Sequence, residues 1–209
     1  MDIDKIREKL LAATLARVAF DGWTETALLA GAAQAGIDRA MARNAFPGGP
    51  AELIETFSRE MDLRMLADLE TGDLAALKVR DRIAAGVRAR LEALAPHREA
   101  VRRGLGFFAL PPNAALATKC LYRTVDAIWY AAGDTATDYN FYSKRLLLAG
   151  VYVSTLLFWL DNRSEGCAET WAFLERRISE VLKFGGRLGR ALGGLLDLPE
   201  RLFGRRAEP

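Results

Sequence analysis

The amino-acid sequence predicts an all-α fold. Apolar residues recur three and four positions apart through almost every segment, and no segment shows the period-two alternation of a half-buried strand. Hydrophobic residues make up 51% of the chain and charged residues 27%, which is typical of a globular chain that buries a core. A length of 209 residues suffices for one good-sized domain, or for a small domain joined to a larger one.

The expected helices can be placed in order from their caps and breakers. Thr24 or Thr26 can cap the second helix and Asp38 the third, because their side-chain oxygens accept hydrogen bonds from free backbone N–H groups. Pro96 stops the fifth helix. We expect about nine or ten helices, over residues 3–21, 24–36, 38–46, 51–70, 74–94, 97–105, 114–132, 138–160 and 167–184, with a tenth, glycine-rich helix extending towards residue 203.

The longest apolar stretch covers residues 146–160 and is interrupted by Ser154 and Thr155. A membrane span needs about 20 residues, so we expect a buried central helix or a dimer-interface helix.

The N-terminus has neither the layout of a signal peptide nor the composition of a mitochondrial transit peptide. Cys120 and Cys167 fit buried thiols in a reducing compartment. The sequence therefore predicts a complete, cytosolic chain.

The charge is unevenly distributed. Residues 1–60 carry 7 basic and 9 acidic groups, and residues 61–175 carry 14 of each. Residues 176–209 carry 8 basic and 4 acidic groups, so the positive excess lies in the C-terminal segment. A basic end on an otherwise balanced chain indicates an anionic surface as its partner.

The N-terminal residues predict a helix-turn-helix-like unit. Its third helix offers Arg39 and Arg43 one turn apart, followed by Asn44, but residues 1–60 are net acidic, whereas DNA binding needs several basic groups on one face. We predict a retained scaffold. Over about 50 residues the order of small and aromatic residues resembles TetR-type regulators, and a ligand-responsive DNA-binding regulator of this type remains the alternative. The matching residues are Gly22, Thr24, Ala27, Ala30, Ala33, Gly36, Ile37, Phe46, Pro47, Glu52 and Leu53.

The most specific pattern lies between residues 126 and 145. Gly133 suits the left-handed position at a helix end, and Asp134 with Thr137 or Asp138 can cap the next helix. The pattern resembles the coenzyme Q biosynthesis accessory lipid-binding family (the Coq-nine family). The resemblance covers roughly residues 10–185, includes a second block at residues 170–178, and is carried in the centre by Trp129, Ala132, Gly133, Asp134, Thr137, Asp138, Asn140, Tyr142 and Arg145. Phe141 stands where the animal proteins have a tryptophan.

The resemblance implies a TetR-like, dimeric, membrane-peripheral accessory protein of ubiquinone biosynthesis. Such a protein would hold an isoprenoid quinone intermediate or another lipid and present it to the demethoxyubiquinone hydroxylase. It would act at the inner face of a bacterial membrane, or on the matrix side in a mitochondrion. The Pro-Gly break at residues 47–50 and the basic C-terminal pattern divide the chain into a three-helix unit (1–48), a body (49–184) and a basic amphipathic segment (185–209). The resemblance implies that the body binds lipid and forms the dimer. The implied pocket rim or partner surface comprises Trp129, Tyr130, Asp134, Asp138, Asn140, Phe141, Tyr142 and Arg145.

These residues also have structural readings. The aromatic side chains can be core residues that join two helices, and Asp138 can be a helix cap. Arg145 can pair with a local carboxylate, although burial beside aromatics would also suit a lipid head group.

The C-terminal segment combines an apolar stripe with arginines that lie mostly off it, as an interfacial membrane helix does. It can instead be a terminal helix packed on the body. Its glycines cost about 1 kcal/mol each in a helix. The expected membrane-contact residues are Arg187, Leu188, Arg190, Leu192, Leu195, Leu196, Leu202 and Phe203.

The chain carries no pattern of catalytic or metal-ligating residues. Its single histidine, His97, follows a proline at a helix start, where we expect it to be solvated. The sequence contains no Glu-x-x-His and no Cys-x-x-Cys pattern. We therefore expect no enzyme activity, no metal and no cofactor. A purely structural adaptor with a filled core is a further alternative.

Overall fold

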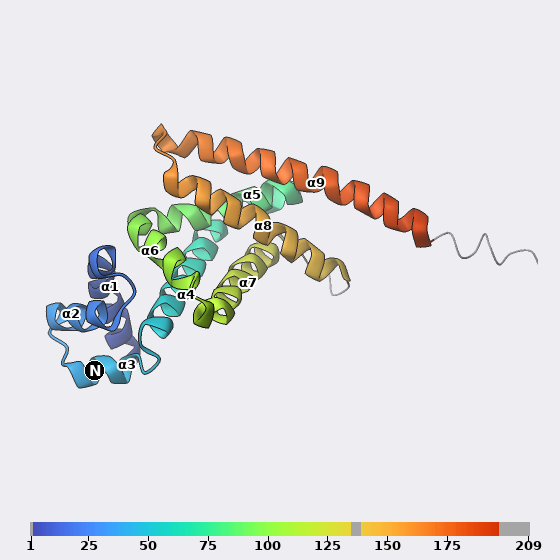
Figure 1. Cartoon of the computed structure of the whole chain (residues 1–209). Coiled ribbons are helices and arrows are strands. Elements are labelled where there is room, and N and C mark those ends of the chain that lie inside the picture. Colours follow the sequence, from blue (N-terminus) through green and yellow to red (C-terminus); the bar gives the residue numbers. More distant parts are fainter. Residues whose placement is uncertain (1, 135–138, 197–209) are drawn as a thin grey trace, which may run out of the picture.

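The computed structural model describes residues 2–134 and 139–196, and it is built of helices, with no strand in this part of the chain (Figure 1). Short 3-10 turns lie at Leu74–Ala76, Ala95–His97, Pro111–Asn113 and Glu165–Cys167. The all-α prediction is confirmed. The helices are α1 (Ile3–Asp21), α2 (Glu25–Ala35), α3 (Arg39–Ala45), α4 (Gly49–Glu70), α5 (Val79–Leu94), α6 (Arg98–Phe108), α7 (Ala114–Ala131), α8 (Tyr139–Asp161) and α9 (Ala168–Leu196).

The caps of the N-terminal unit agree with the sequence. Thr24, rather than Thr26, caps α2, and its hydroxyl oxygen accepts from the Ala27 N–H at 3.2 Å. Gly36 ends α2 with φ +68°, a left-handed conformation that favours glycine. The Asp38 carboxylate accepts from two backbone N–H groups at the start of α3.

The start of α5 and the end of α9 differ most from the prediction, and α6 ends at Phe108 rather than near residue 105. Residues 74–76 form a 3-10 turn and Leu77 is extended, so α5 begins at Val79 rather than near residue 74. The separate tenth helix is wrong, because α9 continues without interruption from Ala168 to Leu196. Glycine costs helix stability but keeps its N–H group, so a glycine-rich stretch weakens the hydrogen-bond ladder without breaking it. The boundary predicted between residues 184 and 185 therefore falls inside α9.

One hydrophobic core joins the N-terminal unit to the body. The predicted boundary between residues 48 and 49 coincides with the start of α4, yet the core cluster continues across it from α1 to α9. Trp23 is buried, and its indole N–H donates to the Ala100 carbonyl of α6 at 2.9 Å. Figure 1 shows α1 to α3 at one end of the molecule and α4 leading from them into the body.

Helix α8 packs its inner face on the body. Its buried residues include Leu148, Val151, Tyr152 and Trp159. Within the described residues, the stretch Tyr142–Asp161 is long and apolar enough to cross a membrane by length and composition, and 44% of it is buried in the protein. This burial agrees with the prediction of a core-facing helix. The opposite face exposes apolar side chains, including Leu146 at 75%.

Candidate ligand cavity and the junction of α7 and α8

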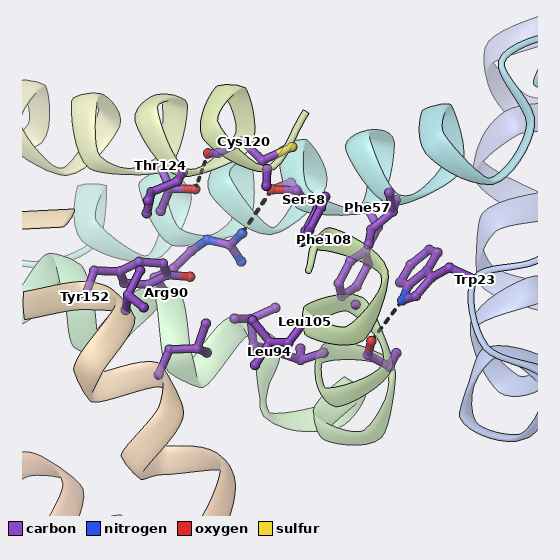
Figure 2. Close-up of a pocket in the computed structure, with 18 residues that line it drawn as sticks. Trp23, Phe57, Ser58, Arg90, Leu94, Leu105, Phe108, Cys120, Thr124 and Tyr152 are labelled. Atoms are coloured by element: carbon purple, nitrogen blue, oxygen red, sulfur yellow. Dashed lines mark hydrogen bonds between the residues drawn. The ribbon is translucent and has the colours of Figure 1, made fainter. Parts of the chain in front are cut away.

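An apolar cavity of about 190 Å³ lies among α4, α5, α6, α7 and α8. Figure 2 shows side chains from these helices, together with Trp23, converging on it. Its walls are mostly aliphatic and aromatic carbon, which is typical of sites for small apolar ligands. The lining residues are Trp23, Ile54, Phe57, Ser58, Arg90, Leu94, Ala100, Val101, Gly104, Leu105, Phe108, Ala117, Cys120, Leu121, Thr124, Tyr152, Val153 and Leu156.

The cavity has a buried interior and a half-exposed mouth. Trp23, Phe57 and Arg90 are buried to 4% exposure or less. The lining residues that remain partly exposed come from the C-terminal half of α6, the first half of α7 and the middle of α8. These residues form the mouth, and they are Leu105, Phe108, Ala117, Leu121 and Val153.

A buried charged cluster adjoins the cavity. Arg90 Nε lies 2.9 Å from Asp62 Oδ1, an ion pair without hydrogen-bond alignment, and Arg90 Nη2 donates to the Ser58 carbonyl oxygen at 3.2 Å. Asp62 also accepts from Arg123 Nε at 2.9 Å and from the Thr124 hydroxyl at 2.7 Å. The side chains of Arg90 and Asp62 are only 4% and 5% exposed. The buried carboxylate of Asp62 on α4 therefore accepts two hydrogen bonds from α7 and forms an ion pair with Arg90 of α5.

Two titratable groups of the cavity wall, Tyr152 and Cys120, are neutral at ordinary pH. Burial raises the pKa of the Tyr152 phenol, and the nearby Arg90 opposes this only in part. Burial also raises the pKa of the Cys120 thiol, against the effect of Arg123. A protonated thiol is a poor nucleophile. Cys120 therefore behaves as a packing residue, as expected, whereas Cys167 is only partly buried.

His97 lies against the core rather than in solvent. Its ring packs edge-on to Phe57, with ring centroids 5.6 Å apart, and it is half-buried. Burial lowers the pKa of this imidazole, and the charge of Arg64 lowers it further. The expectation of a solvated histidine is therefore wrong, because the turn at Pro96 directs the ring inwards onto α4.

The end of α7 forms a Schellman motif. Gly133 adopts φ +85°, its N–H donates to the Tyr130 carbonyl, and the Asp134 N–H donates to the Trp129 carbonyl, both at 3.0 Å. This pair of hydrogen bonds satisfies the last free carbonyls of the helix. The predicted left-handed helix end at Gly133 is confirmed.

Buried ion pairs join the end of α7 to the start of α8. Asp134 Oδ1 accepts from Lys144 Nζ at 2.8 Å, and Asp134 Oδ2 lies 3.3 Å from Arg145 Nη1. Arg145 Nε also donates to Asp126 Oδ1 at 2.7 Å. The side chains of Asp134 and Arg145 are 7% and 6% exposed. The prediction that Arg145 pairs with a local carboxylate is confirmed, and the pairing connects the two helices.

The junction brings together several of the predicted site residues. The Trp129 indole N–H donates to the Lys144 carbonyl at 3.2 Å, and Lys144 Nζ lies 5.5 Å from the centre of its ring. Tyr130 and Tyr142 are exposed at 79% and 68%. None of these residues lines the cavity, so their role as a pocket rim or partner surface stays a prediction.

Some predicted residues lie partly or wholly outside the described structure. Asp138, Leu202 and Phe203 are outside the described residues. Asn140 and Phe141 fall in the first turn of α8, but their side chains are outside the described part. The same holds for the predicted membrane-contact residues within α9, namely Arg187, Leu188, Arg190, Leu192, Leu195 and Leu196.

The cluster of Asp62, Arg90 and Arg123 was not predicted from the sequence. A signal was present, because Asp62 falls in the apolar stripe of α4 beside Met61 and Met65. Arg90 likewise falls in the buried stripe of α5. A charge at a core position of an amphipathic helix indicates a buried partner.

In the helix-turn-helix-like unit, one of the two arginines predicted for a basic surface is paired with a carboxylate. Arg43 donates through Nε and Nη2 to Glu25 of α2, at 2.9 and 2.8 Å. Arg39 is exposed on the same helix. The pairing neutralises one of the two arginines that the DNA-binding alternative requires.

The fold defines the chain as a TetR-like helical protein. A solved TetR transcriptional regulator from Nitrosomonas europaea matches it with a TM-score of 0.70 over 85% of this chain and 98% of that chain. The two sequences are 22% identical, so this likeness concerns the fold alone.

The sequence is also similar to one protein family. The COQ9 family model matches residues 114–185, which include both sequence blocks of the predicted resemblance. The mitochondrial ubiquinone biosynthesis protein COQ9 of Homo sapiens is 31% identical over 87% of this chain and 59% of that protein. The COQ9-B protein of Xenopus laevis is 33% identical over 88% and 65%, and the Drosophila melanogaster protein 30% over 91% and 60%. The predicted resemblance to the COQ9 family is confirmed, and the chain spans about 60% of the length of these relatives.

Proposed function

We propose that this protein is a non-enzymatic, lipid-binding accessory protein of ubiquinone biosynthesis. The observation that carries the proposal is an apolar cavity with one buried polar end, in a chain that matches the COQ9 family model. A cavity of this composition suits the apolar tail and compact head of an isoprenoid intermediate or another lipid. The described residues contain no group of three or more possible metal ligands, and Cys120 and His97 are held neutral by burial.

Lipid binding can be tested by closing the mouth. Ala117 is half-buried at the mouth, so Ala117→Trp places an indole across the entrance, whereas Ala115→Trp adds the same side chain to an exposed position of α7. Mass spectrometry of lipid extracts from gently purified protein should find co-isolated isoprenoid or other lipid in the wild type and in Ala115→Trp. Ala117→Trp should carry much less. Wild-type protein that carries no lipid and takes up none from liposomes would overturn the proposal.

We propose that the junction of α7 and α8 contacts the hydroxylase that acts on demethoxyubiquinone. Tyr130 and Tyr142 are large, exposed side chains on the two helices that the Asp134–Arg145 ion pair connects. Tyrosine is enriched among the side chains that dominate the energy of protein interfaces. A homodimer, as the family resemblance implies, is part of the same proposal and is tested by light scattering of the purified chain.

The C-terminal part of α9 is proposed to bind membranes. Figure 1 shows this part extending beyond the body of the protein. A basic residue near an anionic membrane contributes about 1 kcal/mol, so Arg187→Gln with Arg190→Gln should weaken binding to phosphatidylserine vesicles about thirtyfold. Arg163→Gln, which changes an exposed arginine between α8 and α9, is the matched control. Equal flotation of all three proteins with the vesicles would contradict a membrane role for this segment.

The alternative, a ligand-responsive DNA-binding regulator, rests on the TetR-like fold and on Arg39 and Arg43. A gel-shift assay with the DNA upstream of the chain's own gene separates the two functions. A shift that Arg39→Ala abolishes would favour the regulator. A protein that retains lipid and causes no shift would favour the accessory function.

A further inference from the structure

The polar end of the cavity contains a hydrogen-bond donor that the protein itself does not use. Arg90 Nη1 is fully buried and has no hydrogen-bond acceptor among the described residues. A buried, unsatisfied donor on a charged group is costly, so its retention calls for an acceptor at that position. Arg90 lines the cavity, and Figure 2 shows its side chain near Tyr152 and Ser58, away from Trp23.

The charge around Arg90 favours an oxygen acceptor. Asp62 is shared between the guanidinium groups of Arg90 and Arg123. Glu55, the next carboxylate, is held by Lys119 at 2.6 Å and lies 3.7 Å from Arg123 Nη1. The three cations thus face two carboxylates, and this part of the site keeps one positive charge in excess. A carbonyl, phenol or phenolate oxygen would meet that charge.

The neighbouring polar groups suit a ring that bears oxygen. Tyr152 keeps its proton, because burial raises the pKa of its phenol, and its hydroxyl group is available as a donor or an acceptor. Ser58 and Thr124 supply further hydroxyls at the same end. The rest of the wall is apolar, so hydrogen bonding to a ligand is confined to the Arg90 end.

The volume limits how much of a ligand the cavity encloses. Pockets that enclose a drug-sized ligand measure roughly 300–1,000 Å³, and this cavity measures about 190 Å³. It therefore admits a compact head group and the first part of a tail, and the remainder of a long tail has to leave through the mouth.

We propose that Arg90 anchors the oxygen-bearing head group of an amphipathic ligand of the prenylated quinone or phenol class, head innermost, through its unused Nη1. The tail leaves between α6, α7 and α8, past Leu105, Phe108 and Val153. This inference rests on the proposed lipid-binding function and adds to it the class of head group and the direction in which the ligand lies.

The test compares two ligands that differ only in their oxygens. A benzoquinone with two isoprenyl units and the matching prenylated benzene hydrocarbon are titrated into the full chain by isothermal titration calorimetry in dilute detergent. A hydrogen bond to a charged group is worth about tenfold or more in affinity. The wild type should therefore bind the quinone at least tenfold more tightly than the hydrocarbon.

Three variants test whether Arg90 causes the preference for the quinone over the hydrocarbon. Arg90→Met should abolish it while hydrocarbon affinity stays within about twofold, and Arg90→Lys, which retains a cationic donor, should restore part of it. Arg88→Met, an exposed change on the same helix, should behave as the wild type. Hydrocarbon binding also shows that the cavity of each variant is folded.

The outcomes separate this inference from the proposed function. An unchanged preference in Arg90→Met, or an equal loss of both ligands, would overturn the anchoring role of Arg90 and leave lipid binding intact. A wild-type protein that binds neither ligand would overturn the proposed lipid binding and this inference together.

Discussion

Removing the carboxylate of Asp62 should lower the free energy of unfolding much more than removing the guanidinium of Arg90. Asp62 is buried and receives hydrogen bonds from Arg123 and Thr124 in addition to its ion pair with Arg90. In Asp62→Ala, the guanidinium of Arg90 stays buried without a counter-charge, which costs about 3–5 kcal/mol. The loss of the Arg123 contact adds little, because that side chain is 28% exposed and reaches solvent and Glu55.

Arg90→Met leaves the carboxylate with most of its partners. Asp62 keeps the Arg123 and Thr124 donors, and methionine fills the apolar space of the arginine stem, so we expect a cost below about 2 kcal/mol. The double variant Asp62→Ala, Arg90→Met should be more stable than Asp62→Ala alone, because it contains no buried unpaired charge.

Urea unfolding followed by circular dichroism measures these differences. With an m value of about 2–3 kcal/mol/M, Asp62→Ala should lower the midpoint by about 1–2 M. Asp68→Ala, on the exposed side of α4, is the control and should stay within about 0.5 kcal/mol of the wild type. The reasoning is refuted if Arg90→Met costs as much as Asp62→Ala, or if Asp62→Ala resembles the control.

Three further predictions concern packing and protonation. Gly31→Ala should destabilise the protein by about 1–3 kcal/mol, because the added Cβ would lie 2.8 Å from the Thr14 backbone. Gly106→Ala, with open space around the added Cβ, should stabilise the protein by about 0.5–1 kcal/mol. Thermal unfolding measures both changes. Trp23→Phe, measured in urea, should cost about 1–2 kcal/mol through its lost hydrogen bond to α6. Burial lowers the pKa of His97, so wild-type stability should fall as the pH drops below 6.5, and His97→Gln should flatten this slope.

The sign of the histidine effect follows from its lowered pKa. The unfolded chain takes up a proton near pH 6.5, while the folded chain takes it up only at lower pH. The unfolded state therefore binds more protons in this window, and stability is full above pH 6.5 and is lost as the pH falls through the folded pKa. A slope that is identical in the wild type and in His97→Gln would assign the pH dependence to other groups.

Local signals in the sequence predicted most of the fold. Caps such as Thr24 and Asp38, and the left-handed end at Gly133, depend on neighbouring residues only, so they can be read from the chain. The separate tenth helix was wrong, because glycine lowers helix stability without removing a hydrogen bond. The inward turn of His97 depends on packing against Phe57, forty residues away in the chain, which no local pattern reports.

The candidate site was predicted in part. The residues at the α7–α8 junction were found because they form a compact block in the sequence, and the structure brings Trp129, Asp134 and Arg145 together. The cavity could not be predicted from the sequence, because its walls come from five helices. In each helix taken alone, the lining residues look like ordinary core residues. Burial decides which of them face the cavity, and burial is a property of the assembled fold.

The cavity and the junction lie on the same two helices, and this gives a test of whether they act separately. Along α8, Arg145 of the junction and Tyr152 of the cavity are seven residues apart, which is about 10 Å at 1.5 Å per residue. Tyr142→Ala with Tyr130→Ala should weaken hydroxylase binding at least tenfold, as the loss of exposed aromatic anchors does. Quinone affinity should stay within about twofold, because neither tyrosine lines the cavity.

Surface plasmon resonance with the immobilised hydroxylase and calorimetry with the short-tailed quinone give the two readouts. Tyr122→Ala is the matched control, because Tyr122 is also an exposed tyrosine of α7 at 45% exposure. A double variant that still binds the hydroxylase as the wild type does would remove the junction as the contact surface. A parallel loss of quinone affinity would show instead that the junction sets the position of α7 and α8 around the cavity. The buried pair of Asp134 and Arg145 is the connection through which this effect would have to pass.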